Sequence, residues 1–196
     1  GKTTKKDPGK GSGDLRKATG IELLIENSKV NFSSKLIVGA GGSNCPVSRS
    51  LLKETYGLNP INRDHMCGGW REYWTNVKGC NNDVGSIEIH FLYDVIPGYF
   101  WLFPTSGGQV NVGCGILSSE LDKRKDKLRI TQQKIIQEHP DFKERFANAT
   151  FVEGSGKGWQ LPFGSPKKGE TLHPRRLFGN GIVCVGDSAS LIDPFS

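Results

Sequence analysis

Apolar residues in this chain recur with two different spacings, and each spacing predicts one type of secondary structure. Alternating or continuous apolar runs predict strands at residues 21–25, 35–38, 86–93, 99–104 and 109–117. The last two runs are separated only by a short polar turn that is typical of a hairpin. The middle of the chain is therefore predicted to form an antiparallel sheet.

Helical spacing appears in three stretches. One predicted helix begins at Pro46, where the first turn tolerates proline, and ends near Gly57. A second helix is predicted over residues 121–138 and is ended by Pro140, and a third over residues 142–149. These helices separate the early strands from the middle block and from the end of the chain.

Short strands are also predicted near residue 151, at 159–163 and at 181–185, whereas residues 27–34 are predicted to be a polar connection. Strands with crossovers at both ends and an antiparallel block between them predict two interleaved domains. One domain uses the beginning and end of the chain, and the other is built from its middle. The fold class is α/β (α+β).

Composition is that of a globular chain. It has 196 residues, 35% of them hydrophobic, and a mean hydropathy of −0.42. No stretch approaches the roughly 20 apolar residues of a membrane span, and no secretory signal is visible. The five cysteines form no C-x-x-C pair, so a disulfide framework or a metal site is not expected. Reduced thiols indicate a cytoplasmic protein.

Charge is unevenly distributed. The net charge is +6, and the basic, glycine-rich residues 1–20 are predicted to be a flexible tail. A basic surplus attracts phosphate groups or an anionic membrane surface. No nucleic-acid-binding motif accompanies it, so a nucleic-acid partner is not expected.

The stretch K-L-I-V-G-A-G-G-S-N-C-P-V-S-R at residues 35–49 resembles the start of a dinucleotide-binding unit. A G-x-G-x-x-G fingerprint needs a third glycine, and here Gly39 and Gly41 are followed by Asn44. Taken alone, the stretch therefore indicates an ordinary glycine turn between a strand and a helix.

A second glycine turn follows the last predicted strand. A buried strand leads to Gly186 and Asp187, and a carboxylate at such a position can accept hydrogen bonds from ribose hydroxyls. The G-D-S triplet also matches the nucleophile block of some serine esterases. That block needs a downstream His, and none of the nine residues after Asp187 is His.

An aromatic strand occupies the middle of the chain. Tyr99, Trp101 and Phe103 alternate, so their rings project to one face. Such a face can line an apolar tunnel, although ordinary core packing gives the same pattern. Gly113 and Gly115 would let a flat ring approach the backbone.

Together these segments resemble a known family. Residues 39–49 resemble the second nucleotide motif of flavoproteins with the aromatic-hydroxylase fold, and residues 186–194 resemble the third, G-D-A-A-x-x-x-x-P. Residues 97–115 and 157–165 are similar to the geranylgeranyl reductase family, with its Y-x-W-x-F-P…G-x-G segment. The resemblance runs from about Ile21 to Ser196. The family's N-terminal G-x-G-x-x-G lies outside it, so we expect the chain to be a fragment.

The resemblance implies a two-domain FAD-binding fold, in which Rossmann-like segments flank an antiparallel substrate domain. The implied domains are residues 1–20 (tail), 21–58 and 176–196 (FAD-domain segments) and 59–175 (substrate domain). The implied cofactor-binding residues are Gly39, Gly42, Asn44, Arg49, Gly186, Asp187, Asp193 and Pro194. The implied substrate-binding residues are Tyr99, Trp101, Phe103, Pro104, Gly113, Cys114 and Gly115. This sequence departs from the family pattern at Gly41, usually Asp, and at Cys45, usually Ser.

By the same resemblance the intact protein is expected to be an FAD-dependent oxidoreductase that reduces C=C bonds of a polyprenyl chain. NAD(P)H or another donor would supply electrons, and no catalytic proton donor is assigned. Peripheral contact with a membrane is expected for a prenyl lipid substrate. Two alternatives stay open: a flavin-dependent monooxygenase or halogenase on the same fold, and an inactive fragment or binding module.

Overall fold

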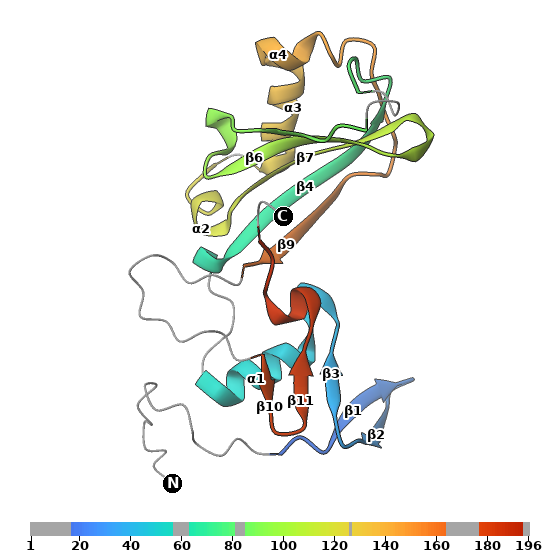
Figure 1. Cartoon of the computed structure of the whole chain (residues 1–196), viewed down its shortest axis with the longest axis vertical. Coiled ribbons are helices and arrows are strands. Elements are labelled where there is room, and N and C mark those ends of the chain that lie inside the picture. Colours follow the sequence, from blue (N-terminus) through green and yellow to red (C-terminus); the bar gives the residue numbers. More distant parts are fainter. Residues whose placement is uncertain (1–16, 57–62, 81–84, 126, 164–176, 194–196) are drawn as a thin grey trace. The chain divides into compact units, whose positions relative to one another are not determined.

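The computed structural model contains two compact units, and each is described by itself (Figure 1). One unit comprises residues 1–65 and 162–196, and the other comprises residues 66–161. The second unit thus lies inside the predicted substrate domain of residues 59–175. The structure describes residues 17–56, 63–80, 85–125, 127–163 and 177–193.

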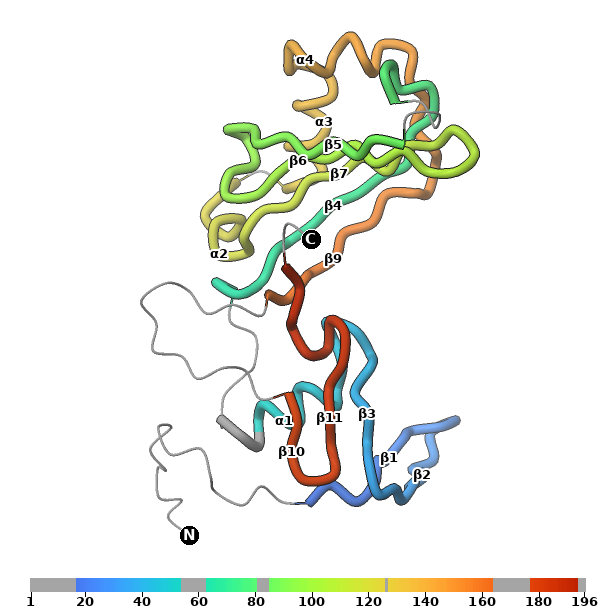
Figure 2. Tube along the Cα trace, in the orientation of Figure 1, coloured from blue at the N-terminus to red at the C-terminus, as the bar shows by residue number. Residues whose placement is uncertain are grey.

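The first unit is built on a small sheet beside one helix. β3 (Ile37–Gly39) and β11 (Ile182–Cys184) run parallel and side by side, and β10 (Phe178–Gly179) pairs antiparallel with β11 (Figure 2). The helix predicted to begin at Pro46 is confirmed as α1 (Pro46–Tyr56), and its Leu51 packs against Cys184 and Ala189. Gly57, the predicted helix stop, lies outside the described residues.

A hairpin precedes this sheet. The predicted strand at residues 21–25 is confirmed as β1 (Gly20–Ile25), which pairs with β2 (Ser28–Ser33). The prediction of a polar connection over residues 27–34 was therefore wrong. Glu26 and Asn27 have φ values of 47° and 66°, as a tight hairpin turn requires. Backbone pairing through this turn makes a strand of β2 despite its polar side chains.

The second unit is an antiparallel sheet with helices on one face (Figure 1). Its strand order is β5-β6-β7-β4-β8, and β9 also pairs with β4. The hairpin of the aromatic strand and the glycine-rich strand is confirmed, since β6 pairs with β7 along the whole length of β6. The strands are β4 (Met66–Thr75), β5 (Glu88–His90), β6 (Gly98–Pro104), β7 (Gln109–Leu117), β8 (Thr150–Phe151) and β9 (Lys157–Pro162).

The core of this unit lies between the sheet and its helices. Phe100 and Leu102 of β6 and Val112 of β7 are fully buried. Ile135 and Phe142 from the helices are at most 2% exposed. Each core strand contributes every second residue, as a pleated strand must. The other residues of the same strands therefore emerge on the face that the helices leave uncovered.

Two predicted helices are shorter than expected. The helix predicted over residues 121–138 divides into α2 (Ser118–Leu121) and α3 (Leu128–Glu138), because the Arg124 guanidinium between them donates hydrogen bonds to the backbone oxygens of Asp94 and Ile96. The helix predicted over residues 142–149 is only the single turn α4 (Pro140–Lys143). No helix in the described parts of the chain is long and apolar enough to span a bilayer.

The longest strand, β4, was not predicted, because a buried carboxylate interrupts its apolar pattern. Glu72 is only 4% exposed and faces α3. Its two oxygens accept hydrogen bonds from Trp70 Nε1 (3.0 Å), Trp74 Nε1 (3.1 Å) and Gln132 Nε2 (3.0 Å). These donors satisfy the carboxylate and join β4 to the helix.

An ion pair holds the end of the helical layer against β5. Arg145 donates two parallel hydrogen bonds to Glu88, of 2.7 Å from Nη1 and 2.6 Å from Nη2, and a third to the backbone oxygen of Lys78. His90 also lies 2.9 Å from Glu88 through Nε2. The hydrogen bonds from Arg145, and to a lesser extent that from His90, hold the pKa of Glu88 below its ordinary value, although partial burial opposes them.

We therefore predict that Glu88→Gln lowers the free energy of unfolding by about 1.5–3 kcal/mol at pH 7, the typical cost of losing a charged hydrogen bond. Because the folded pKa is lowered, the contribution exists above the unfolded pKa and disappears as the pH falls through the folded pKa. Urea unfolding at pH 7 and pH 3 measures both effects. An equal deficit at the two pH values would contradict the ion-pair account.

Candidate functional site

The uncovered face of the second unit's sheet is lined by aromatic rings. On β6, Tyr99, Trp101 and Phe103 are half-buried and lie opposite the buried Phe100 and Leu102. The ring centroids of Tyr99 and Trp101 are 5.9 Å apart, and those of Trp101 and Phe103 are 6.0 Å apart with planes 29° from parallel. The prediction that these three rings share one face is confirmed, and we call this side of the sheet the open face.

Neighbouring strands extend the open face. Ile89 of β5 lies opposite Trp101, and the Phe91 and Tyr99 rings are 6.4 Å apart. The strand predicted over residues 86–93 is shorter than expected, because only Glu88–His90 pair with β6. Ile87, Ile89 and Phe91 are 63%, 36% and 61% exposed. On β7 and β4 the open face holds Gly113 and Gly115, then Cys67, Gly69, Arg71 and Tyr73.

Gly113 lets the Trp101 indole lie against the backbone. A Cβ atom on Gly113 would be 2.2 Å from Cζ2 of Trp101, far below any van der Waals contact. A Cβ on Gly115 would be 3.0 Å from the Cys67 Sγ. The flat ring that these glycines were predicted to admit is thus, at Gly113, the ring of Trp101. Its Nε1 is fixed by a 3.0 Å hydrogen bond to Asn111 Oδ1.

Not every predicted substrate residue lies on this face. Pro104 ends β6 and is half-buried, whereas Cys114 belongs to the opposite, helix-covered face and is fully buried. Its Sγ points to the backbone oxygen of Leu128 at 3.7 Å, and burial raises its pKa to about 12. Cys114 therefore cannot line the open face, because β7 directs its side chain to the core.

Several open-face residues were not among the predicted substrate residues, and three of them have large side chains. Arg71 and Tyr73 project from β4 beside Gly113 and Asn111. A Cβ atom on Gly156 or Gly158 would contact Trp70, whose side chain lies on the helix-covered side of the sheet. Because side chains alternate along a strand, Trp159 of β9 lies on the open face. The signal was present in the alternation of M-C-G-G-W-R-E-Y-W-T, once Glu72 is accepted as an inward residue.

The first unit brings together the two glycine turns. Because β3 and β11 are parallel neighbours, with Gly39 opposite Cys184, the turns that follow them lie at the same sheet edge. Val185 N donates to Gly39 O at 3.0 Å, and the Ser188 hydroxyl donates to the same oxygen. The described parts of residues 39–49 and 186–194, the two segments that resemble nucleotide motifs, therefore lie beside each other.

The backbone at these turns is open on one side. Gly42 and Gly186 have φ values of 70° and 59°, and a Cβ on either would meet nothing within 4 Å. Beside them, Asn44 Oδ1 accepts a 2.6 Å hydrogen bond from Arg49 Nη2. Positive φ and free space at two adjoining turns fit a ligand that approaches the backbone closely, as a nucleotide does.

Of the remaining predicted cofactor residues, two follow β11 in the described part of the chain. Asp187 is half-buried in the short 3-10 turn Gly186–Ala189, and Asp193 is exposed. Pro194 lies outside the described residues. The described residues at this edge thus combine open backbone with one half-buried carboxylate.

Cys45 immediately precedes α1 and is 2% exposed. Burial alone would raise the pKa of its thiol, but hydrogen bonds from the N–H groups of Ser48, Gly41 and Val47 outweigh it and lower the pKa.

The family model that matches this chain covers most of the second unit. Residues 66–154 match the family model described as the geranylgeranyl reductase catalytic domain. Over 187 residues the chain is 29% identical to digeranylgeranylglycerophospholipid reductase 2 of Methanopyrus kandleri, covering 93% of this chain and 42% of that protein. Reductase 1 of the same organism is 30% identical over 185 residues, which are 93% of this chain and 44% of that protein. The resemblance to this family is confirmed, and the chain spans about two fifths of these relatives' length.

Solved structures share the fold. A geranylgeranyl bacteriochlorophyll reductase-like protein from Thermoplasma acidophilum has a TM-score of 0.68 and 20% identity, over 92% of this chain and 40% of that one. The flavin-dependent brominase Bmp2 has a TM-score of 0.66 and 18% identity, over 93% and 44%. The predicted mixed fold, with its antiparallel sheet, is therefore confirmed. These structures do not separate reductase from halogenase chemistry.

We predict that Gly113→Ala displaces the Trp101 ring, because its new methyl group would occupy the position of the indole. The expected loss of stability is about 1–3 kcal/mol, the usual cost of overpacking, together with a shift in tryptophan emission. Urea unfolding followed by fluorescence measures both effects. Gly69→Ala on the same face is the control, since its nearest atom would be 3.9 Å away. Equal effects from the two variants would argue against this packing.

Proposed function

Because residues 66–154 match the geranylgeranyl reductase catalytic domain, we propose that the protein containing this chain is an FAD-dependent reductase that saturates C=C bonds of a polyprenyl lipid. The observation that carries the proposal is the row of Tyr99, Trp101 and Phe103 on a face that none of the described helices of its unit covers. The relatives named above support a prenyl lipid as substrate.

The open face is suited to a prenyl tail. Its rings give a flat apolar surface. Beside them, Gly113, Gly115 and Gly69 form a strip without side chains of its own, which the Trp101 ring covers at Gly113 and the Cys67 Sγ at Gly115. An isoprenoid chain lying along this strip would bury apolar surface at roughly 25 cal/mol per Å² and displace water from the double bond. The rigid Trp101–Asn111 pair would hold the alkene in one orientation.

The turns after β3 and β11 would hold the nucleotide part of FAD. Asp187 would accept hydrogen bonds from ribose hydroxyls, and the open backbone at Gly42 and Gly186 would admit the phosphates. When bound in its reduced form, FAD supplies the hydride for the double bond, and NAD(P)H or another donor restores it. The residues of this chain supply binding, orientation and exclusion of water.

We also propose that the protein works in the cytoplasm at the surface of the membrane that holds its lipid substrate. Tyr93 is 94% exposed and Ile96 is 50% exposed, and both border a cavity of about 380 Å³ that Asp94 and Arg124 also line. An exposed aromatic ring next to a cation is typical of side chains that enter a lipid headgroup region. This supports peripheral contact.

The protein containing this chain, purified with FAD and given dithionite and a digeranylgeranyl phospholipid, should yield product heavier by one hydrogen molecule for each saturated bond. Trp101→Ala should lower kcat/KM at least about 10-fold, since it removes the centre of the aromatic row. Mass spectrometry of the lipid measures both effects. Ile130→Ala, an exposed change on α3, is the control.

Two results would contradict the proposal. If reduced flavin consumed oxygen and hydroxylated or halogenated a substrate while no lipid gained hydrogen, the monooxygenase or halogenase alternative would hold. If the protein bound no flavin and changed no prenyl lipid, the chain would belong to a binding module.

A further inference from the structure

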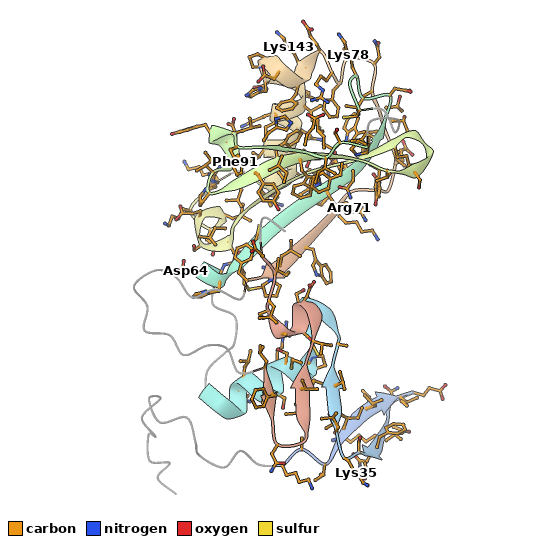
Figure 3. All side chains as sticks on the ribbon, in the orientation of Figure 1. Lys35, Asp64, Arg71, Lys78, Phe91 and Lys143 are labelled. Carbon is orange, nitrogen blue, oxygen red and sulfur yellow. The ribbon has the colours of Figure 1, made fainter. Side chains whose placement is uncertain are left out.

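Arg71 is the one arginine among the strand residues of the open face, and its position suggests a role that the aromatic row cannot perform. It lies on β4 directly opposite Gly113, which in turn lies opposite Trp101 on β6. Gly113, the residue between them in this row, carries no side chain, and the Trp101 indole lies over it. Figure 3 shows Arg71 on the side of the sheet away from α3 and α4.

We propose that Arg71 binds the anionic phosphate headgroup of the prenyl substrate while the tail lies across Trp101. This inference rests on the proposed function, because it assigns the headgroup end of the same site. It makes Arg71 a residue that determines substrate specificity. It also gives the site a direction, with the headgroup beside β4 and the tail toward β5.

The guanidinium has donors to spare. It carries five N–H bonds, of which Nη1 donates to the backbone oxygen of Ser155 at 2.9 Å. Its central carbon lies 4.6 Å from the centroid of the Tyr73 ring, and stacking of this kind leaves the edge of the guanidinium plane available. No carboxylate among the described residues forms an ion pair with Arg71. A planar fork with unused donors matches two oxygens of a phosphate.

Charge on the open face favours an anion. Alternation along β9 brings Lys157 to the same face, and no Asp or Glu occupies an open-face position of the described strands. Burial raises the pKa of the Cys67 thiol to about 11 and that of the Tyr99 phenol above its ordinary value. Both groups are therefore neutral at pH 7, and the two cations are not cancelled.

A purely structural role for Arg71 makes a different prediction. Ser155 belongs to the loop before β9, which is already held by hydrogen bonds from Tyr73 N to Ser155 Oγ and from Val152 N to Tyr73 O. If Arg71 only anchored this loop, its loss would affect every substrate alike. If it binds the headgroup, its loss affects only substrates that carry a negative charge.

The test compares Arg71→Met with the unaltered protein containing this chain, loaded with FAD, on geranylgeranyl diphosphate and on geranylgeraniol. Met keeps an apolar stem beside Tyr73 and removes the charge. We expect KM for the diphosphate to rise roughly 10- to 100-fold with kcat little changed, the range for a lost charged hydrogen bond. KM for the neutral alcohol should stay the same. Arg71→Lys should restore part of the loss.

A matched control and a binding measurement complete the design. Arg129→Met removes an equal charge from the exposed side of α3 and should leave both KM values unchanged. Quenching of tryptophan fluorescence by geranylgeranyl diphosphate gives the dissociation constant without turnover, and it should rise with Arg71→Met by the same factor as KM. This readout tests the inference even if no lipid is reduced, which would defeat only the proposed function.

Three results would overturn the inference. Equal losses on the diphosphate and the alcohol, with a lower melting temperature, would make Arg71 an anchor for the 152–155 loop. A fall in bound flavin would assign it to the phosphates of the cofactor. An unchanged dissociation constant for the diphosphate would show that Arg71 contacts no headgroup.

Discussion

The ring of Trp101 lies against the backbone of Gly113, and the second unit is organised around that contact. A strand alternates its side chains between two faces, so the register that brings Trp101 over Gly113 also buries Phe100 and Leu102 beneath α3 and α4. One face thereby becomes core and the other becomes an aromatic surface. A shift by one residue would exchange the two faces, which is why the packing of the core and the layout of the site cannot vary independently.

The first unit depends on a similar adjacency. Gly39 and Gly186 are far apart in sequence, yet the parallel pairing of β3 with β11 brings their turns to one sheet edge. The Ser188 hydroxyl and Val185 N both donate to Gly39 O, so the two turns are tied at one carbonyl. Neither turn alone distinguishes a nucleotide site from an ordinary connection. Together they bring two glycines with positive φ and free space around them, Gly42 and Gly186, to one sheet edge. Backbone of this kind can admit a phosphate.

The sequence was most informative where local chemistry decides the structure. Pro46 starts α1, and the alternation of Tyr99, Trp101 and Phe103 gives β6 its open face. It was less informative where distant contacts decide. The break between α2 and α3 follows from hydrogen bonds of Arg124 to the 94–96 segment, which helical spacing cannot reveal.

The candidate site shows the same limit. The strand β4 was not predicted because a glutamate in a strand pattern normally indicates an exposed position. Glu72 is instead buried, where it accepts hydrogen bonds from Trp70, Trp74 and Gln132. Missing β4 also concealed Arg71. Cys114 was wrongly predicted to bind substrate. It lies between two glycines of the open face, so strand alternation directs its side chain to the core.

The central claim is that a prenyl chain lies on the open face of the sheet, across Trp101. Photoaffinity labelling with a geranylgeranyl diphosphate whose tail carries a benzophenone tests this directly, with the attachment points mapped by mass spectrometry of peptides. We expect labels on open-face residues of β6 and on Ile89 or Phe91 of the adjoining β5 segment, and we expect their loss when unlabelled geranylgeranyl diphosphate competes. Labels on the outer surface of α3, or labels that competition does not remove, would contradict it.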